Sequence, residues 1–588
     1  MYLIPTPQKV TEKSELLLKK EVFLVNEISD TKIKKAAAKL PVNESGIPLY
    51  ITYRDTNEEG YRLSVSNDEI KIDGDGINGA FYAIQTLRQI FDNDEIFCVE
   101  IEDKPKNIIR GVYQDVTRGK VPTVETMKWF IDQLAYSKLN TLHLYVEHAF
   151  PFKEHYGTLD ISCCITPEDI KELDEYCKEN FIDLVPSIAT ASHLYDLLNV
   201  PQNVHLRELK EYKPKYHFWF ERQDHHTIDI ENPEGIEFIK SLINQYASNF
   251  SSKYIHICGD EPFDLIRFGW REAAGIDVRN MYSDYMLNLI DYVKSLGKTP
   301  MVWGSVVNRD REDLRSRIGD DVLVCRASYQ IEPTEERFVK FEGQKFQSIV
   351  CPGTSSYYRL VENAYASEQN IRNISVYAKK YDSIGMLNTN WGDYGNPCSL
   401  ELSMFGIFAG AQMSWDFENL LDDEFKKAIN KLLYNNDQGF EYVYKTDRIH
   451  AKANYWQLVR YYSNCIFPDR EIRWTKYPSV EDVQEAAVKS KELYDELSAQ
   501  KWERDEYRIE LLSALYGTGV IAELFIKHMT GTEPERWTNT EDWLKEYREL
   551  WVKKNKESEL FRIEEFFRGV EALPPQNKIF TYYGPEMD

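Results

Sequence analysis

The sequence has few features that would indicate a membrane, a nucleic acid or a secretory route. Its first residues, Met-Tyr-Leu-Ile-Pro-Thr-Pro-Gln-Lys, contain no basic segment followed by an apolar stretch, so no signal peptide is predicted. No apolar run approaches membrane-spanning length, and the net charge of -25 leaves no excess of lysine and arginine for binding phosphates. We therefore expect neither a membrane nor a nucleic acid as a partner.

Disulfide and metal-binding patterns are also missing from the sequence. The nine cysteines are odd in number, include the vicinal pair Cys163-Cys164, and show neither Cys-x-x-Cys nor Cys/His ligand spacing. His143 and the pair His225-His226 likewise lack ligand spacing. We therefore expect no metal and no cofactor, and we interpret the cysteines as free thiols in a reducing cytoplasm.

The order of apolar patterns divides the 588 residues into three parts, as expected for a chain too long for one core. Residues 1–105 alternate strand-like runs with polar turns and contain a helical pattern at 80–91, which predicts a small α+β domain. Residues 106–420 alternate strand and helix eight times, which predicts a (β/α)₈ barrel in an α/β fold. Residues 421–588 carry long amphipathic runs and predict a helical domain that caps the barrel without taking part in chemistry.

The expected barrel strands are eight largely apolar segments of five to nine residues. They cover residues 108–116, 141–147, 182–188, 254–260, 299–305, 322–327, 348–352 and 384–391. A Gly-x-Gly-x-x-Gly match at 74–79 is interpreted as a turn from strand to helix, because no parallel strand ending in an acidic residue follows it.

The strongest functional signal is the segment Tyr-Ile-His-Ile-Cys-Gly-Asp-Glu at 254–261. Neighbouring residues of a strand point to opposite faces, so Asp260 and Glu261 can face one substrate only if the strand stops and Gly259 turns the backbone out of the sheet. Paired carboxylates at the carboxyl end of a barrel strand are what sugar cleavage requires.

Other barrel strands also carry polar or aromatic residues. A ring of arginine, acids and tryptophans at one rim is how proteins hold a sugar, because aromatic faces cover its C–H surface while charged groups bind its hydroxyls. The candidates on the first, second, fifth and eighth strands are Arg110, Glu147, Trp303, Trp391 and Asp393.

These motifs carry a resemblance that covers residues 1 to about 420 in the correct order. The segments Arg-Gly-Val-Tyr-Gln-Asp (110–115), His-Ile-Cys-Gly-Asp-Glu (256–261) and Asn-Trp-Gly-Asp (390–393), together with the segment around His193, resemble family 20 of the glycoside hydrolases, the β-N-acetylhexosaminidases. The segment 79–89 is similar to the small α+β domain that precedes the barrel in that family.

The resemblance implies an exo-acting hydrolase that uses substrate-assisted, retaining catalysis. The 2-acetamido oxygen of the substrate attacks the anomeric carbon and forms an oxazolinium. Asp260 would orient that acetamido group and stabilise its positive charge. Glu261 would protonate the leaving oxygen and then deprotonate the incoming water.

The resemblance also implies roles for the surrounding residues. Arg110 would bind the outer hydroxyls of the sugar, and Tyr357 would donate a hydrogen bond to the acetamido oxygen. Glu147 and His193 would hold Asp260 and its neighbours in place. Trp303 and Trp391 would form aromatic walls around the acetamido group and the sugar ring.

Three departures from the family pattern affect this assignment. Cys258 replaces the usual first glycine of the His-x-Gly-Gly-Asp-Glu motif. Asp393 stands where many members carry glutamate, so whether Asp393 contacts the sugar is left open. The seventh strand lacks Tyr-x-Asp, so the tyrosine assignment could move from Tyr357 to Tyr358.

Two alternative functions remain open at this stage. A conventional retaining glycosidase would need a nucleophile on the seventh strand, where no carboxylate precedes Glu362. A non-catalytic carbohydrate-binding protein would not need two adjacent acids. The choice between N-acetylglucosamine and N-acetylgalactosamine, the aglycone and the oligomeric state are left open by the sequence.

Overall fold

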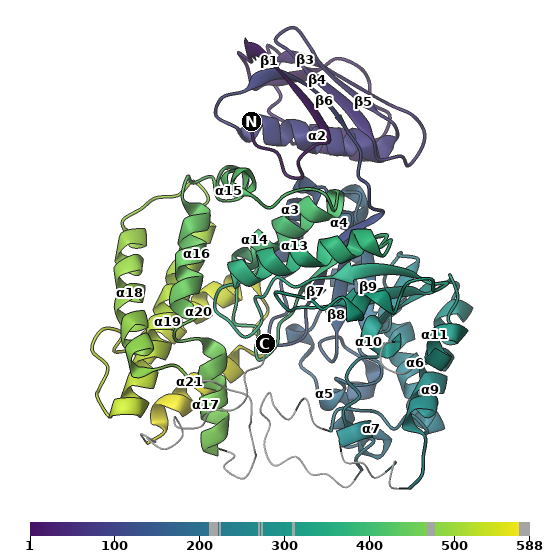
Figure 1. Ribbon diagram of the computed structural model, residues 1–588, viewed down its shortest axis with the longest axis vertical. Coiled ribbons are helices and arrows are strands. Elements are labelled where there is room, and N and C mark those ends of the chain that lie inside the picture. Colours follow the sequence, from purple (N-terminus) through teal and green to yellow (C-terminus); the bar gives the residue numbers. More distant parts are fainter. Residues whose placement is uncertain are drawn as a thin grey trace.

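The computed structural model describes residues 1–210, 222, 225–267, 271, 274–307, 312–466 and 477–574 of the chain. It contains an α+β domain, a barrel and a group of helices, in the order predicted from the sequence (Figure 1). The α+β domain lies at one end of the barrel, and the C-terminal helices lie beside it (Figure 1).

The N-terminal domain is a mixed sheet with the strand order β1-β6-β4-β5-β3-β2 and a long helix, α2, against one face (Figure 1). The glycine-rich segment forms the predicted turn from β5 into α2. A Cβ atom at Gly79 would lie 2.0 Å from the carbonyl oxygen of Gly60, so these glycines allow close backbone packing. The elements are β1 (Lys9–Leu16), β2 (Val22–Leu24), α1 (Thr31–Ala37), β3 (Ile47–Tyr53), β4 (Tyr61–Val65), β5 (Ile70–Gly74), α2 (Ile77–Asp92) and β6 (Phe97–Asp103).

The second part is a closed barrel of eight parallel strands, which confirms the predicted fold. Seven strands lie within one or two residues of their expected bounds, whereas β10 ends at His256, four residues early. The strands are β7 (Ile109–Asp115), β8 (Thr141–Val146), β9 (Asp183–Ile188), β10 (Tyr254–His256), β11 (Thr299–Trp303), β12 (Leu323–Ala327), β13 (Gln347–Cys351) and β14 (Gly385–Asn390).

Helices follow these strands and cover the outside of the barrel. Their buried residues recur every three or four positions, as in α4, where Ile170, Leu173 and Cys177 are buried. The helices are α3 (Val124–Tyr136), α4 (Pro167–Glu179), α5 (Tyr195–Leu198), α6 (Pro233–Ala247), α7 (Asp264–Arg267), α9 (Val278–Ser295), α10 (Gly304–Val307), α11 (Glu312–Arg317), α12 (Glu336–Val339), α13 (Ala364–Lys380) and α14 (Met404–Trp415).

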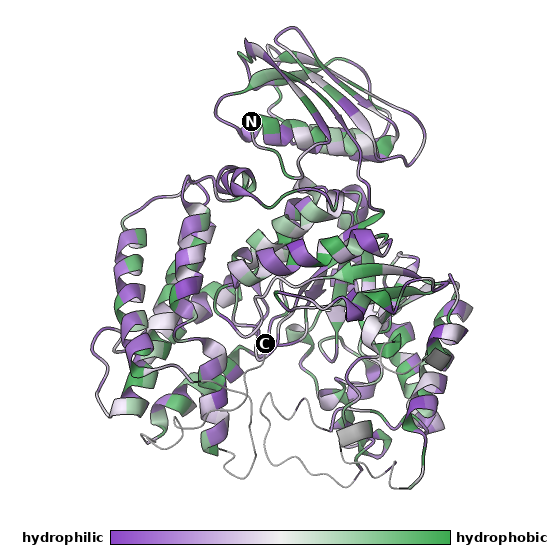
Figure 2. Ribbon diagram, in the orientation of Figure 1, coloured by the Kyte–Doolittle hydropathy of each residue, from purple (hydrophilic) through white to green (hydrophobic). Residues whose placement is uncertain are grey.

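The C-terminal region is helical, as predicted, and α18 shows the alternating hydrophilic and hydrophobic stretches of a helix with one buried face (Figure 2). The expectation that no apolar run reaches membrane-spanning length is wrong for α19. This helix is long and apolar enough, but 83% of the apolar window is buried inside the protein. The helices are α15 (Asp423–Ile429), α16 (Gly439–His450), α17 (Tyr455–Ile466), α18 (Val480–Ser498), α19 (Asp505–Thr530), α20 (Thr540–Lys554) and α21 (Leu560–Ala572).

The link between α20 and α21 is attached to the loop that follows the first barrel strand. The backbone N–H of Lys556 donates to the carbonyl of Val121 at 2.8 Å, and Ser558 Oγ donates to the carbonyl of Gly119 at 2.6 Å. The C-terminal helices are therefore joined to the barrel at its carboxyl-end loops, where barrel enzymes place their active sites.

Candidate active site

The early end of β10 places the two adjacent acids. After His256 the backbone enters left-handed conformations at Cys258 (φ 50°), Gly259 (φ 84°) and Glu261 (φ 50°), so the chain turns out of the sheet. A Cβ atom at Gly259 would lie 2.5 Å from Met286 Cε, so the turn requires glycine for space as well as for its backbone angle. The glycine turn predicted from the sequence is present.

Both acids face the same imidazole. His193 Nε2 lies 3.7 Å from Asp260 Oδ2 and 3.3 Å from Glu261 Oε2. The side chain of Glu261 is 48% exposed and that of Asp260 only 23%, so the two neighbours have different environments. Burial raises the pKa of Asp260, but His193 and Arg118 outweigh it and hold this pKa below its usual value. Asp260 is therefore ionised at neutral pH.

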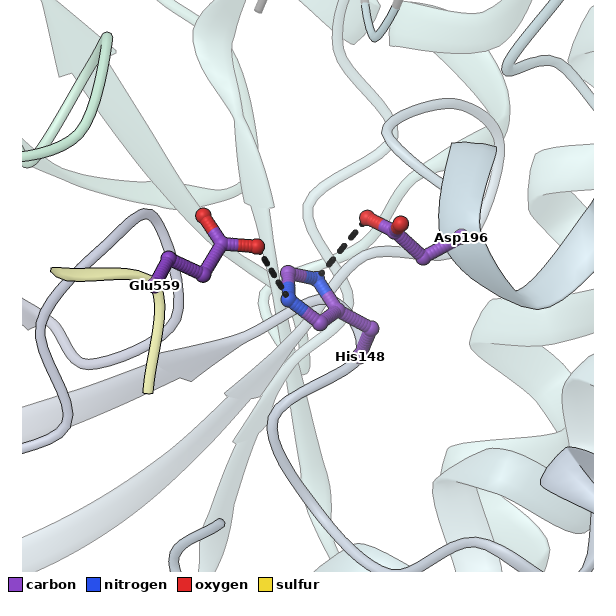
Figure 3. A group of neighbouring side chains, drawn as sticks. All are labelled: His148, Asp196 and Glu559. Atoms are coloured by element: carbon purple, nitrogen blue, oxygen red, sulfur yellow. Dashed lines mark ion pairs between the residues drawn. The ribbon is translucent and has the colours of Figure 1, made fainter. Parts of the chain in front are cut away.

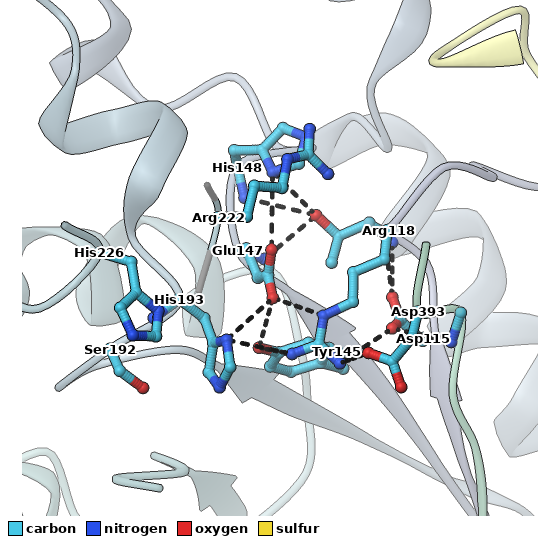
Figure 4. A network of polar contacts seen from close by, with 12 residues as sticks. Asp115, Arg118, Tyr145, Glu147, His148, Ser192, His193, Arg222, His226 and Asp393 are labelled. Carbon is cyan, nitrogen blue, oxygen red and sulfur yellow. Dashed lines mark hydrogen bonds and ion pairs between the residues drawn. The ribbon is translucent and has the colours of Figure 1, made fainter. Parts of the chain in front are cut away.

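His193 lies between Asp260 and Glu261 on one side and Glu147 on the other, and Figure 4 shows the Glu147 side. Its backbone N–H donates to His226 Nδ1 at 2.9 Å, and its own Nδ1 lies 3.8 Å from Glu147 Oε1. Burial lowers the pKa of His193, yet Asp260 and Glu261 together raise it to about 10. At neutral pH, His193 is therefore a cation that links Glu147 to the acidic pair.

Arg118 connects two acids at the carboxyl ends of the strands (Figure 4). Its Nε donates to Glu147 Oε1 at 2.7 Å and its Nη1 donates to Asp393 Oδ1 at 2.8 Å. Its guanidinium carbon lies 5.2 Å from the ring centroids of Tyr145 and Trp391. Arg118, and not Arg110, is therefore the arginine that lies at the carboxyl-end rim of the barrel.

The expectation that Arg110 binds the sugar is wrong. Arg110 begins β7, so it lies at the amino end of the barrel, and it is fully buried. Its guanidinium donates to Glu59 Oε1 and to Tyr82 Oη, each at 2.8 Å, and both partners belong to the N-terminal domain. The barrel is filled by side chains, so a residue at its amino end cannot reach the opposite rim.

The two predicted tryptophans lie close together over the barrel floor. The rings of Trp303 and Trp391 are 5.7 Å apart, and each lies about 5 Å from the ring of Tyr113. The indole N–H of Trp391 donates to Tyr329 Oη at 2.9 Å. Trp391 is 8% exposed and lies beside Arg118, so it borders the polar part of the site.

Tyr357 and Tyr358 are separated by their packing. Tyr357 lies 6.2 Å from the ring of Tyr329, which itself contacts Trp391. Tyr358 is left-handed (φ 62°) and its ring stacks on Trp456 of α17 at 4.5 Å. Burial and the nearby Asp393 raise the pKa of both tyrosines, so both lie near the polar part of the site.

Asp393 follows β14 and faces Arg118. Burial raises the pKa of Asp393 to about 6, although Arg118 acts in the opposite direction. The carboxyl group is 19% exposed, so it is accessible to a ligand while remaining largely desolvated. Such a group binds hydroxyls strongly because solvent competes little for it.

A second charged cluster lies behind Glu147. The imidazole of His148 lies between Asp196 and Glu559, with its Nδ1 3.5 Å from Asp196 Oδ2 and its Nε2 3.5 Å from Glu559 Oε1 (Figure 3). The two acids contact different ring nitrogens, an arrangement that suits a protonated imidazole. Arg222 also pairs with both acids. Glu559 belongs to the C-terminal region, so that region contacts His148, the residue that follows Glu147 in the chain.

Glu362, the one acid noted near the seventh strand, is turned away from this group of residues. It is fully buried, and its Oε2 accepts a hydrogen bond from the backbone N–H of Gly406 in α14 at 3.0 Å. Burial holds the pKa of Glu362 well above its usual value, so it is protonated. A protonated acid that faces α14 does not supply the nucleophile of a conventional retaining glycosidase.

Sequence comparison assigns both the sheet domain and the barrel to one family. The sequence model "Glycosyl hydrolase family 20, catalytic domain" matches residues 109–394, and "Glycosyl hydrolase family 20, domain 2" matches residues 1–104. The chain belongs to family 20 of the glycoside hydrolases.

The curated relatives of this family 20 chain are distant in sequence, and each relative is longer than the part of it that matches. Beta-hexosaminidase subunit A1 of Dictyostelium discoideum is 26% identical over 271 residues, which cover 43% of this chain and 49% of that protein. Lacto-N-biosidase of Bifidobacterium bifidum is 24% identical over 381 residues, which cover 62% of this chain and 31% of that protein. The chain thus spans about half the length of the curated relatives it matches, or less.

Solved family 20 structures show the same fold. An exo beta-N-acetylglucosaminidase from Vibrio harveyi has a TM-score of 0.57 and 19% identity, covering 73% of this chain and 76% of that chain. A chitobiase from Flavobacterium johnsoniae has a TM-score of 0.57 and 16% identity, covering 96% of this chain and 99% of that chain.

Several residues of the site were missed by the sequence analysis. Arg118 and Asp115 lie at or just beyond the carboxyl end of β7, where Asp115 accepts from the backbone N–H groups of Arg118 and Gly392. The rule that sites form at the carboxyl ends of barrel strands pointed to them. Tyr329 and Trp456 had no such signal, because each reaches the site from a loop or helix with no motif.

Proposed function

We propose that the protein is an exo-acting β-N-acetylhexosaminidase that removes terminal N-acetylglucosamine, N-acetylgalactosamine or both by substrate-assisted, retaining hydrolysis. The observation that carries the proposal is the pair of adjacent carboxylates turned toward His193 at the carboxyl end of β10. The names of the relatives, a beta-hexosaminidase subunit and an exo beta-N-acetylglucosaminidase, support this activity.

In this mechanism Asp260 acts as an anion. Its lowered pKa keeps it ionised, and its carboxylate faces the acetamido nitrogen as that nitrogen gains positive charge. The more exposed Glu261 stands where a leaving group and then a water can reach it, so it acts as acid and then as base. His193 and Glu147 hold Asp260 in its orientation.

The remaining residues bind the sugar. Arg118 and Asp393 hold its outer hydroxyls, since a carboxylate and a guanidinium accept and donate hydrogen bonds respectively. Tyr357 donates to the acetamido oxygen, and Trp303 and Trp391 cover the apolar surface of the ring and the acetamido methyl group.

We also propose a reducing compartment, the cytoplasm, as the place of action. All nine cysteines are free thiols, and Cys258 lies among polar groups at the barrel floor, 3.5 Å from the hydroxyls of Tyr113 and Ser187. Cysteines that form no disulfide bonds are typical of proteins that fold under reducing conditions.

Substrate selectivity tests the mechanism. The protein should hydrolyse nitrophenyl 2-acetamido-2-deoxy-β-glycosides and should barely act on the matching β-glucoside and β-galactoside, because a C2 hydroxyl cannot form an oxazolinium. A thiazoline mimic of the intermediate should bind far more tightly than the free sugar, and Asp260→Asn should weaken that binding. Efficient cleavage of a plain β-galactoside, or a sugar trapped on a protein carboxylate, would reject the proposal.

The role of Glu261 has its own test. Glu261→Gln should lose roughly 10²–10⁴-fold in kcat on an alkyl glycoside and much less on an activated aryl glycoside, because a poor leaving group needs a proton. Equal losses on both substrates would show that Glu261 is not the acid. Binding without turnover of any glycoside by the wild-type protein would instead support a carbohydrate-binding protein.

A further inference from the structure

Two loops of the site each contain a tyrosine in a strained backbone conformation. Tyr358 (φ 62°) follows Tyr357 in the loop after β13, and Tyr394 (φ 56°) follows Asp393 in the loop after β14. Bulky residues rarely adopt left-handed angles, and they keep them only when surrounding contacts enforce them. Each strained tyrosine therefore directly neighbours a residue proposed to hold the sugar.

One side chain of the C-terminal region contacts both tyrosines. The ring of Trp456, the second residue of α17, stacks on Tyr358 with centroids 4.5 Å apart and an interplanar angle of 26°. It also packs edge-on against Tyr394 at 4.8 Å and 64°. The guanidinium carbon of Arg460, one helical turn later, lies 4.1 Å from the Trp456 ring.

The residue before Trp456 also holds the second loop. Tyr455 is fully buried, and its Oη donates to the carbonyl oxygen of Tyr394 at 3.0 Å. The first turn of α17 thus contacts the backbone and the ring of Tyr394, and the ring of Tyr358. The rings of Tyr358 and Tyr394 also contact each other, 5.2 Å apart.

We propose that Trp456 is a positioning residue for the glycosidase site. It holds Tyr358 and Tyr394 in their left-handed conformations, and through them it sets the positions of Tyr357 and Asp393. This inference rests on the proposed function, in which those two residues bind the substrate. The C-terminal helices then contribute to catalysis as well as to stability, in contrast to the cap without chemistry that the sequence suggested.

The structure accounts for the use of tryptophan at this position. Its large planar ring stacks on Tyr358, meets Tyr394 in a T-shaped arrangement and lies against Arg460, so a single residue contacts two loops from different strands. A smaller side chain would leave space beside both tyrosines and would let each relax to a more common backbone angle. Displacement of about 1 Å at a substrate-binding group can cost ~10²-fold in rate.

The test compares Trp456→Ala with Trp456→Phe and with a matched control. Trp502 is a buried tryptophan of the same helical region, packed against Tyr434 and Tyr442, neither of which belongs to the site. On a nitrophenyl N-acetylglucosaminide, Trp456→Ala should lower kcat/KM by ~10–100-fold with both kcat and KM affected. Trp456→Phe should recover most of the activity, and Trp502→Ala should reduce stability while the folded enzyme keeps its kcat/KM.

A double-mutant cycle separates positioning from loss of structure. If Trp456 acts through Asp393, the factor lost on Trp456→Ala should be clearly smaller in an Asp393→Asn background than in the wild type. The same factor in both backgrounds, or full kcat/KM in folded Trp456→Ala, would overturn the inference.

A folding failure of Trp456→Ala and an inactive wild-type protein would each have a different meaning. If Trp456→Ala does not fold, Trp456→Leu fills much of the same space without stacking and should show the same loss; wild-type activity in that variant would also overturn the inference. A wild-type protein without activity on N-acetylhexosaminides would reject the proposed function instead.

Discussion

At the scale of single residues, the site is a network of acids joined by His193 and Arg118, whose Nδ1 and Nη2 atoms lie 3.3 Å apart. Asp260 is ionised, His193 is protonated, Glu147 is ionised, and Arg118 joins Glu147 to Asp393. Each charge is largely removed from water and is stabilised by its neighbours, so removing one member leaves the others with an uncompensated charge. The residues proposed to bind the sugar and the two adjacent acids are therefore electrostatically coupled.

Arg118 should be essential for activity. Arg118→Ala is expected to lower kcat/KM by at least ~10²-fold, because it removes a donor to the sugar and frees Glu147 and Asp393. Arg118→Lys should recover only part of the loss, since an ammonium cannot contact both acids in the planar geometry of a guanidinium. Steady-state kinetics checks this, and a mild effect on kcat/KM would return the sugar-binding role to another residue.

His193 should make stability depend on pH. Its pKa is 6.5 in an unfolded chain and about 10 in the folded protein. Its contribution is complete below pH 6.5 and is lost as pH rises to the folded value, because only the folded state holds the proton in between. The slope is ~1.4 kcal/mol per pH unit.

The measurement compares the wild type with His193→Gln by denaturant unfolding at pH 6.5 and about pH 9. The stability difference between the two proteins should shrink as pH rises. A difference that stays constant with pH would mean that His193 is neutral in the folded protein.

At the scale of elements, the turn after β10 decides whether two neighbouring acids can face one substrate. The strand ends at His256, and three left-handed residues follow within five positions. Gly259 is the critical position, since Met286 Cε and Val306 Cγ2 would lie 2.5 and 2.9 Å from an added Cβ. Backbone freedom and local space are thus both required there.

Two glycine substitutions separate these requirements. Gly157 has nearly the same φ, 79°, with nothing within 4 Å of an added Cβ, whereas Gly259 has φ 84° and a crowded surrounding. Gly157→Ala should cost ~1 kcal/mol of stability and no activity. Gly259→Ala should cost more stability and most of the kcat. Equal effects in thermal unfolding and in kinetics would show that space around Gly259 is not limiting.

At the scale of the whole molecule, the barrel is held at both of its ends. The N-terminal domain is attached at the amino end through Arg110, Glu59 and Tyr82, and the C-terminal helices are attached at the carboxyl-end loops through Ser558 and Trp456. Among the residues that the structure describes, only the second attachment touches the loops of the site. The two flanking regions therefore have different consequences for catalysis.

Arg110→Met should test the attachment at the amino end. It leaves Glu59 without its cation in a buried contact, so the free energy of unfolding should fall by ~3–5 kcal/mol. The kcat/KM of the folded enzyme should not change, because Arg110 is remote from the site. A large rise in KM at unchanged stability would contradict the placement of Arg110 and restore its predicted role.

The barrel and the adjacent acids Asp260 and Glu261 could be predicted because their signals are local. Alternating apolar residues identified the eight strands, and the run from Tyr254 to Glu261 contained the acids and the glycine that separates them from the sheet. The prediction failed for Arg110 because residue type was weighed above position along the strand. Because of the direction of β7, Arg110 contacts the N-terminal domain, whereas Arg118 lies at the opposite end of the barrel beside Asp393.

By itself the sequence determined the order of the three parts, the barrel, and the identity of Asp260 and Glu261, because periodicity and turn residues act between near neighbours. Only the tertiary structure decided which arginine meets Asp393, which tyrosine packs near Tyr329, and that Trp456 reaches the site loops from the C-terminal helices. Those contacts join residues up to 275 positions apart, as Arg118 and Asp393 do. They arise from barrel closure and helix docking, which no local pattern encodes.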